Sequence, residues 1–196
     1  MDSTVWDTGA WVHAAVIEVT GENLDPEEVH TWIQLLDAYG EEATTRIFDR
    51  VFDPARIRER EPYPGASEAL RSLQDDLGVE VHFVTRNEPE IVGPHLEAWL
   101  RERFGPAVGL TVTTGDKLGI LRELDAFGLV DDRPETLARA ADAGLWAATK
   151  LQTWNRALVA ARPDVHGFSD WREVPDLVYR RVFFRKTDER GERPVL

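Results

Sequence analysis

The sequence predicts an α/β protein built on a doubly wound parallel sheet, and three observations support this class. Between residues 62 and 150, short apolar segments that fit buried strands alternate with segments whose apolar residues recur at helical spacing. Polar side chains directly follow several of the apolar segments, as at the carboxyl ends of strands in such a sheet. Proline and glycine stand near the starts and ends of the predicted helices. Alternating strands and helices imply right-handed parallel crossovers and therefore a doubly wound sheet.

The composition fits this class and excludes others. The chain has 196 residues, 42% of them hydrophobic, which is enough for one globular domain with an insertion. It contains no cysteine, so disulfides and thiolate chemistry are ruled out. The formal charge of −13 repels polyanions, so we do not expect polymeric nucleic acid as a partner. A small phosphorylated substrate still fits if a metal and a few local cations offset the field.

The helices of the first 60 residues are predicted from apolar periodicity and breakers. One helix is expected over Trp11–Val19, a second stops at Gly40, and a third is broken by Pro54. We expect residues 20–60 to form a small helical insertion. They could equally be the first helices of a helical domain.

The remaining organisation follows from the change of pattern after residue 60. Residues 1–19 and 61–182 are expected to form the α/β core, and residues 183–196 a charged, flexible tail. No apolar run is long enough to span a membrane and no signal peptide precedes the first helix, so we expect a cytoplasmic protein without a membrane partner. A homodimer is compatible with the sequence.

The core elements can be placed in order along the chain. Their expected positions are a helix over 66–73 ended by Gly78, a strand over Val79–Val84, a helix from Pro94 to Gly105, a strand over Leu110–Val112, a helix capped by Asp116, a strand over 126–130, a helix from Pro134 to Gly144, a strand from Ala147, and late helices over Trp154–Ala161 and Trp171–Val182.

The stretch from residue 128 to 144 is the most informative part of the sequence. Its apolar strand ends in two adjacent acids, Asp131 and Asp132, and Pro134 then opens a helix. Two neighbouring carboxylates repel each other unless a cation neutralises them, and Mg²⁺ prefers carboxylate oxygen. The alternative is an Asp-rich turn in which Asp132 caps the helix.

Three kinds of polar group are expected at this edge of the sheet. Thr85 ends one predicted strand, Lys117 follows the next, and Asp131 and Asp132 end the third. A hydroxyl, an ammonium and a metal-binding acid pair are what a phosphoryl transition state needs to hold its oxygens.

This combination resembles the haloacid dehalogenase superfamily of phosphohydrolases. The second motif of that superfamily would be Val81–Thr85, the third Lys117, and the fourth Leu129–Asp132. Within the superfamily the sequence looks closest to the 5′(3′)-deoxyribonucleotidases, over about residues 62–175. The supporting stretches are Pro64–Leu70, Trp99–Gly105, Asp116–Lys117, Val130–Pro134 and Ser169–Arg172. Each motif is short, but their order and spacing together are fairly specific.

The resemblance implies a haloacid dehalogenase-like, Rossmann-like sheet with a small helical cap inserted after the first motif. It implies hydrolysis of a small phosphorylated metabolite such as a 5′-(deoxy)nucleotide, with Mg²⁺ and an aspartyl-phosphate intermediate. Asp2 would be the general acid and base. The metal would be held by Asp2 together with Asp131 or Asp132.

The same resemblance implies where the substrate binds. Thr85 and Lys117 would hold the phosphoryl oxygens, and Thr4 belongs to the first motif and would line the substrate site. Arg86 could add a contact to substrate, although an Arg at a strand end could instead pair with a surface acid.

The sequence departs from the family at its first motif. Asp2-Ser-Thr4-Val5 matches the second half of that motif, but the nucleophilic Asp would stand two residues before Asp2. The first strand, which is central in this fold, is missing with it. We expect a gap beside the centre of the sheet and an inactive chain as written, either because the chain is truncated before the nucleophile or because it is a true pseudoenzyme. The alternative function is a non-catalytic relative that binds a phosphorylated ligand or a protein partner.

Overall fold

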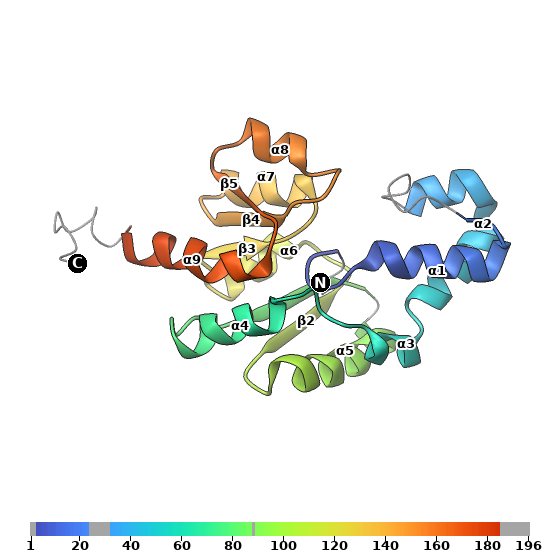
Figure 1. Ribbon diagram of the computed structural model, residues 1–196, viewed down its shortest axis with the longest axis horizontal. Coiled ribbons are helices and arrows are strands. Elements are labelled where there is room, and N and C mark those ends of the chain that lie inside the picture. Colours follow the sequence, from blue (N-terminus) through green and yellow to red (C-terminus); the bar gives the residue numbers. More distant parts are fainter. Residues whose placement is uncertain (1–2, 24–31, 88, 185–196) are drawn as a thin grey trace.

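The computed structural model describes residues 3–23, 32–87 and 89–184. Its parallel strands alternate with helices on both sides, which confirms the predicted α/β class (Figure 1). In chain order the elements are α1 Thr8–Thr20, α2 Trp32–Val51, α3 Pro54–Glu59, α4 Ala66–Asp75, β1 His82–Arg86, α5 Pro89–Phe104, β2 Gly109–Thr113, α6 Lys117–Glu123, β3 Gly128–Val130, α7 Pro134–Asp142, β4 Trp146–Lys150, α8 Arg156–Ala161, β5 Val165–Phe168, the 3₁₀ turn η1 Trp171–Glu173, α9 Val174–Tyr179 and the π-helical turn η2 Arg180–Phe184.

The strands of the described residues form two parallel sheets. In one sheet β1 pairs with β2, with Thr85 opposite Val112, and in the other β4 lies between β3 and β5. Helix α6 packs on β1, α5 on β2, α7 on β3 and β4, and α8 on β5. Strands β2 to β5 are therefore each covered by a helix adjacent to them in the chain, whereas β1 is covered by the more distant α6.

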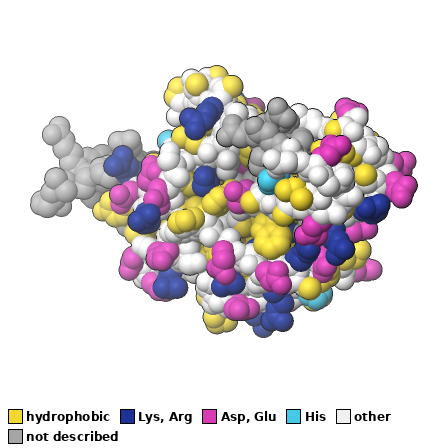
Figure 2. All heavy atoms as spheres, turned by 45° about the vertical axis from the view of Figure 1, so that its right-hand side comes forward, with side chains coloured by type: hydrophobic (Ala, Val, Ile, Leu, Met, Phe, Trp, Pro, Cys, Tyr) yellow, Lys and Arg dark blue, Asp and Glu magenta, His cyan; other side chains and the backbone are white. Residues whose placement is uncertain are grey.

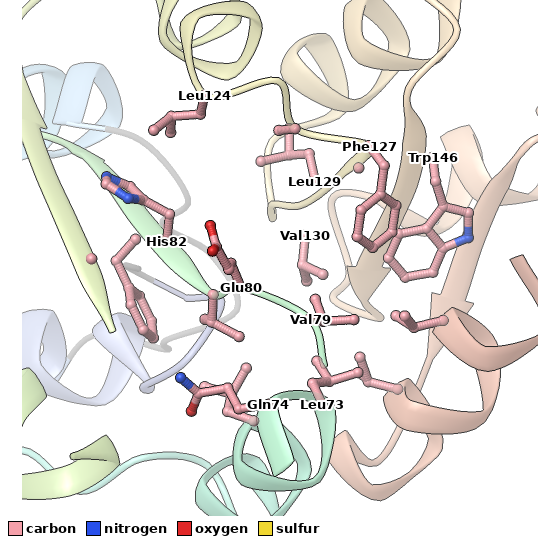
Figure 3. A pocket seen from close by; sticks show the side chains of 18 of the residues that line it. Leu73, Gln74, Val79, Glu80, His82, Leu124, Phe127, Leu129, Val130 and Trp146 are labelled. Atoms are coloured by element: carbon pink, nitrogen blue, oxygen red, sulfur yellow. The ribbon is translucent and has the colours of Figure 1, made fainter. Parts of the chain in front are cut away.

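A cavity separates β1 from β3. It has a volume of about 1020 Å³ and is lined by residues 79–84 on one side and 128–130 on the other, with α4 and α9 contributing apolar side chains. Thr4 and Val5 line it too. Figure 3 shows Val79 and His82 from one side, and Leu129 and Val130 from the other, around a common space. The gap expected beside the centre of the sheet is present. We call it the strand gap.

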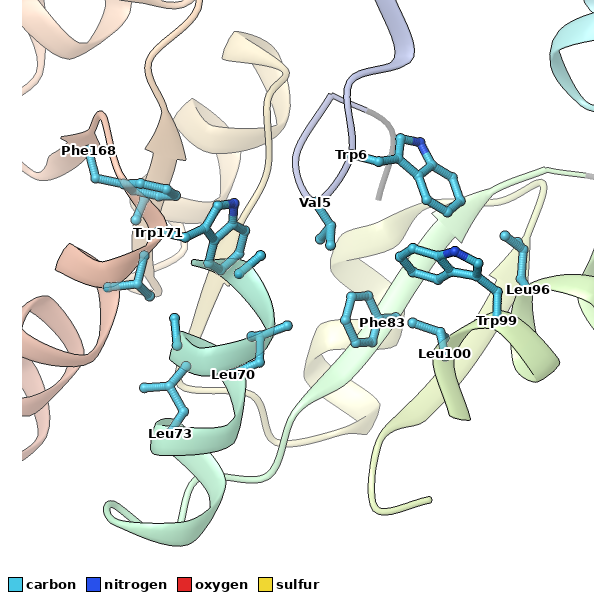
Figure 4. Close-up of a cluster of buried hydrophobic side chains, with 14 of the residues drawn as sticks. Val5, Trp6, Leu70, Leu73, Phe83, Leu96, Trp99, Leu100, Phe168 and Trp171 are labelled. Carbon is cyan, nitrogen blue, oxygen red and sulfur yellow. The ribbon is translucent and has the colours of Figure 1, made fainter. Parts of the chain in front are cut away.

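The main hydrophobic cluster lies beside this gap and joins the start of the chain to the core (Figure 4). Trp6 is 1% exposed and meets Trp99 edge to face, with ring centroids 4.7 Å apart. Trp171 packs against Phe168 and donates from Nε1 to the carbonyl oxygen of Thr4, at 3.0 Å. Burial of such large aromatic groups contributes a major share of the free energy of folding.

Helices α1 and α2 share a separate apolar cluster, in which Ala15, Val16, Leu35, Ile47 and Val51 are buried. By its packing, α1 therefore belongs with α2, on the side of the molecule away from β3–β5 (Figure 1). The predicted stop at Gly40 is seen as a break within α2, because this residue has φ 75° and ψ 174°. Only glycine adopts such a conformation without strain.

Arg60 connects this helical unit to the core. Its side chain is fully buried, and its guanidinium lies 4.5 Å from the centre of the Trp6 ring and 5.5 Å from that of Trp11. It also donates to the carbonyl oxygen of Val51. Trp99 Nε1 donates to the carbonyl oxygen of Arg60, at 2.8 Å. Cation–π contacts and hydrogen bonds thus hold the segment that leads from the helical unit back to the core.

Several predicted elements differ from the structure. The strand expected over Val79–Val84 is β1 His82–Arg86, so Thr85 lies within the strand. Pro94 does not open a helix but lies inside α5, which begins at Pro89. Burial of Val92 and Leu96 around it outweighs the lost backbone hydrogen bond.

The carboxyl-terminal third contains two further differences. The strand β5 was not predicted, because four residues that include Gly167 are too short to give a periodic signal. The helix predicted over Trp171–Val182 is three consecutive turns of different type, η1, α9 and η2.

Some predictions fall outside the described residues. These are the role of Asp2, the start of the helix that precedes Gly40, and the tail after residue 184. Among the residues that the structure does describe, no helix is long and apolar enough to cross a membrane.

Candidate functional site

The candidate site lies where β1, β2 and β3 end. Lys117 is the first residue of α6, and Asp116 caps this helix, as predicted, by accepting from the backbone N–H of Leu118 at 3.4 Å. Because α6 packs on β1 while β3 ends nearby, Lys117 reaches the loop that follows β3.

Lys117 and Asp131 form a mostly buried ion pair. Lys117 Nζ lies 2.8 Å from Asp131 Oδ2, and the two side chains are 12% and 3% exposed. The other oxygen, Oδ1, accepts from the backbone N–H of Arg133 at 3.0 Å. A carboxylate held on both oxygens has a fixed orientation, and its charge is compensated by the ammonium.

The alternative in which Asp132 caps the following helix is wrong. Arg133 occupies the N-cap position of α7 and makes no side-chain capping bond, whereas the predicted Pro134 does begin the helix. Asp131 and Asp132 therefore precede the helix and remain at the carboxyl end of β3.

The backbone of Asp132 is fixed by the loop after β4. Its carbonyl oxygen accepts from Trp154 Nε1 at 3.0 Å and from Asn155 Nδ2 at 3.4 Å. Asn155 Nδ2 also lies 2.8 Å from Thr149 Oγ1. Asn155 is fully buried and links the loop after β3 to the end of β4.

Thr85 and Thr4, the other residues expected at the site, are both buried. Thr85 is 2% exposed within β1, and among the described residues no hydrogen bond joins it to Lys117 or Asp131. Thr4 is buried in the turn before α1 and lines the strand gap rather than the pocket around Lys117.

A second cavity of about 490 Å³ lies beside Lys117, and we call it the basic pocket. It joins the end of β1, the loop after β2 and the start of α7. Its lining residues are Arg86, Thr114, Gly115, Asp116, Lys117, Arg133, Thr136 and Arg139. The sequence analysis identified Arg86 and Lys117 but missed Arg133 and Arg139. The signal in the sequence that could have identified Arg133 is its position directly after Asp132.

The two acids of the site, Asp131 and Asp132, have the chemistry of magnesium ligands. Asp131 and Asp132 supply carboxylate oxygens from adjacent positions, and Mg²⁺ in proteins commonly uses one or two carboxylates together with water and substrate phosphate. Within the described residues, no group of three or more acids or histidines gathers as a complete metal site. Asp2, the third predicted ligand, lies outside those residues.

A further polar group holds the start of the chain near the site. Gln152 Nε2 lies 3.4 Å from the carbonyl oxygen of Ser3 and 3.3 Å from the hydroxyl of Tyr63. Lys150 Nζ lies 4.4 Å from the centre of the Tyr63 ring. Burial, reinforced by the negative charge of Asp7, raises the pKa of Tyr63 to about 12. Tyr63 is therefore protonated at neutral pH.

Charge elsewhere on the surface is mixed. On the face that comes forward in Figure 2, acidic and basic side chains are interspersed. Elsewhere among the described residues, acids and bases pair, such as Arg56 with Glu18 at 2.8 Å and Arg101 with Glu97 at 2.7 Å. The basic pocket differs because cations outnumber acids in its lining on a chain of net charge −13.

Comparison with known proteins supports the fold. No protein-family profile matches the sequence, and no curated protein sequence matches it significantly. The structure is similar to the crystal structure of a haloacid dehalogenase-like family hydrolase from Xanthomonas campestris, with a TM-score of 0.59 and 15% sequence identity. The similarity covers 96% of this chain and 91% of that one. The chain therefore has the fold of a haloacid dehalogenase-like hydrolase.

Proposed function

We propose that this protein is a Mg²⁺-dependent phosphomonoester hydrolase of the haloacid dehalogenase type. We further propose that its active form carries one more strand, with the nucleophilic aspartate, before Met1. The observation that carries the proposal is the buried pair of Lys117 and Asp131, which lies where strands end on either side of the strand gap. The cation can stabilise charge on a phosphoryl group, and the acid can bind a metal, beside the position that the additional strand would occupy.

The roles of the described side chains follow from their chemistry. Lys117 would donate to a phosphoryl oxygen and offset its charge, and Thr85 would add a hydroxyl donor from the end of β1. Asp131 and Asp132 would hold the magnesium ion, which when bound neutralises phosphoryl charge. Trp154 and Asn155 would keep the backbone of Asp132 in place.

The acid–base and nucleophilic steps would come from the start of the chain. An aspartate directly before Met1 would attack phosphorus and release the alkoxide leaving group. Asp2 would protonate that alkoxide and then activate water to hydrolyse the aspartyl phosphate. Both groups would enter the site on the strand that fills the gap.

Several features support a strand in this position. The gap lies between two strand edges that have no strand partner among the described residues, and buried backbone groups normally find such partners. Its walls are mostly apolar, and its volume of about 1020 Å³ is far larger than the voids of an ordinary protein interior. Val5, close to the start of the chain, already lines it.

The substrate would be a small phosphorylated metabolite, and a 5′-(deoxy)nucleotide is our first candidate because of the resemblance to deoxyribonucleotidases. Helices α1 and α2 would act as a cap that closes over the site and excludes water. Their packing as a separate apolar cluster supports movement as one unit.

The test is to compare the 196-residue chain with two extended proteins. Each extension places a short apolar strand before Met1, ending in aspartate in one protein and in asparagine in its control. We expect the aspartate form alone to hydrolyse p-nitrophenyl phosphate or a deoxynucleoside monophosphate with Mg²⁺. The difference should be several orders of magnitude, because loss of a nucleophile removes the covalent route. Equal turnover by all three proteins would show that the nucleophile lies elsewhere in the chain.

A second candidate is a non-catalytic relative that binds a phosphorylated ligand. The observation that favours it is that both carboxylate oxygens of Asp131 already accept hydrogen bonds, from Lys117 and from the backbone of Arg133. Phosphate binding by the 196-residue chain, with no turnover by the aspartate-extended protein, would support this candidate over the enzyme.

A further inference from the structure

The lining of the basic pocket points to a second anionic group on the ligand, next to the phosphate that Lys117 would hold. The pocket contains Arg86, Lys117, Arg133 and Arg139 against a single acid, Asp116. Asp116 is already paired with Arg139, whose Nη2 lies 3.0 Å from its Oδ2. Lys117 is balanced by Asp131 from outside the pocket lining.

Arg86 and Arg133 are the two cations of the basic pocket that have no acidic partner among the described residues. Both side chains are exposed, and among the described residues neither has an ion pair or side-chain hydrogen bond with another residue. They approach the pocket from different elements, Arg86 from the last position of β1 and Arg133 from the N-cap position of α7. Two unneutralised guanidinium groups around one cavity favour an anion there.

The other lining groups fit the same ligand chemistry. Thr114 and Thr136 bring hydroxyl groups, which can donate to anionic oxygens. The volume of about 490 Å³ exceeds what one phosphate group fills, since a water molecule in the liquid takes up about 30 Å³. The arrangement therefore has room for a phosphate at Lys117 and for a further anionic group towards Arg133.

We propose that the basic pocket is a subsite for a second anionic group, a phosphate or a carboxylate, so that the preferred ligand is a phosphomonoester with two anionic ends. This inference rests on the proposed function for the first phosphate. Arg133 and Arg86 are the specificity-determining residues, and Arg139 supports them while it holds Asp116.

The test is calorimetric titration of the 196-residue chain, without metal, with inorganic phosphate and with pyrophosphate. We expect pyrophosphate to bind at least tenfold more tightly than phosphate. Arg133→Gln should remove most of that advantage and leave phosphate affinity within about twofold, because Lys117 is untouched. Arg86→Gln is the second variant, and Arg101→Gln on α5 is the matched control that should change neither affinity.

The outcomes separate the inference from the proposed function. Equal affinity for the two probes, with phosphate binding lost in Lys117→Met, overturns the subsite and leaves the phosphate site intact. An equal loss of both affinities in Arg133→Gln also overturns it, because the arginine would then belong to the first phosphate. Failure of the parent chain to bind either probe overturns the subsite and counts against the proposed function too.

Discussion

The strand gap and the basic pocket lie at the same strands and differ in what surrounds them. The strand gap runs between β1 and β3 and is walled mainly by apolar side chains. The basic pocket lies beyond the ends of these strands and is walled by arginine, lysine and threonine. The lining of the first resembles a protein interior, and the lining of the second has the polarity of a ligand site. The larger cavity is therefore not the one in which chemistry is expected.

Filling the strand gap should give the largest effect on stability. The extension that ends in asparagine before Met1 adds apolar side chains to the gap but supplies no nucleophile. Burial of three or four apolar side chains at about 1.5–3 kcal/mol each should raise Tm by roughly 10 °C or more, at ~2–4 °C per kcal/mol. Differential scanning calorimetry measures the change.

The control for this experiment is an extension of the same composition with its apolar residues interrupted by glycine and aspartate. It should leave Tm close to that of the parent chain. An apolar extension that does not change Tm would mean that the gap is not a strand site.

Breaking the pair of Lys117 and Asp131 should give the next largest effect. Lys117→Met leaves the Asp131 carboxylate buried without its cation, which costs on the order of 3 kcal/mol of unfolding free energy. Arg101→Gln breaks an exposed pair with Glu97 and should cost less than about 0.5 kcal/mol. Urea denaturation measures both. Similar losses in the two variants would show that the buried pair behaves as a surface pair.

Magnesium should stabilise the protein through Asp131 and Asp132. A ligand at 100 times its Kd adds about 2.7 kcal/mol to the unfolding free energy. We expect Mg²⁺ to raise the Tm of the parent chain and of the control variant Asp75→Asn, on the surface of α4. The rise should disappear in Asp131→Asn and in Asp132→Asn. If tens of millimolar Mg²⁺ leave the Tm of the parent chain unchanged, the acid pair is not a metal site in this form.

The smallest expected effect concerns His82, which lines the strand gap. Partial burial lowers its pKa from the ordinary value of 6.5. The folded state therefore resists protonation, and stability is lost as the pH falls from 6.5 through the folded-state pKa. His82→Gln should flatten the dependence of Tm on pH between 7.5 and 5. An unchanged slope would show that other groups, such as His166, carry this dependence.

The sequence predicted the parts of the site that are fixed locally. Asp116 caps α6 and Pro134 begins α7, because capping and proline geometry depend on residues within one turn. The proximity of Lys117 to Asp131 followed from a general rule, that parallel strands end at the same edge of a sheet.

Other parts depend on tertiary contacts that no local pattern contains. Asn155 has the sequence context of a helix start, but its amide nitrogen donates to the carbonyl oxygens of Asp132, after β3, and of Lys150, at the end of β4, which only the folded sheet brings together. The contribution of Arg139 to the basic pocket likewise depends on how α7 lies against the loop after β2. Pro94 lies inside α5 because buried neighbours override its intrinsic preference.

The hydrogen bond between Trp171 and Thr4 also has a consequence for how the protein is made. Its partners are 167 residues apart in the chain, and Gln152 and Ser3 are 149 apart. Ribosomes add ~5–20 residues per second, so Thr4 waits about ten to thirty seconds before Trp171 exists. Until then Thr4 lacks this partner, whereas Trp6 can already pack against Arg60 and Trp99 once those residues are made. Thr4 is therefore made long before its Trp171 partner, and this contact can form only late in synthesis.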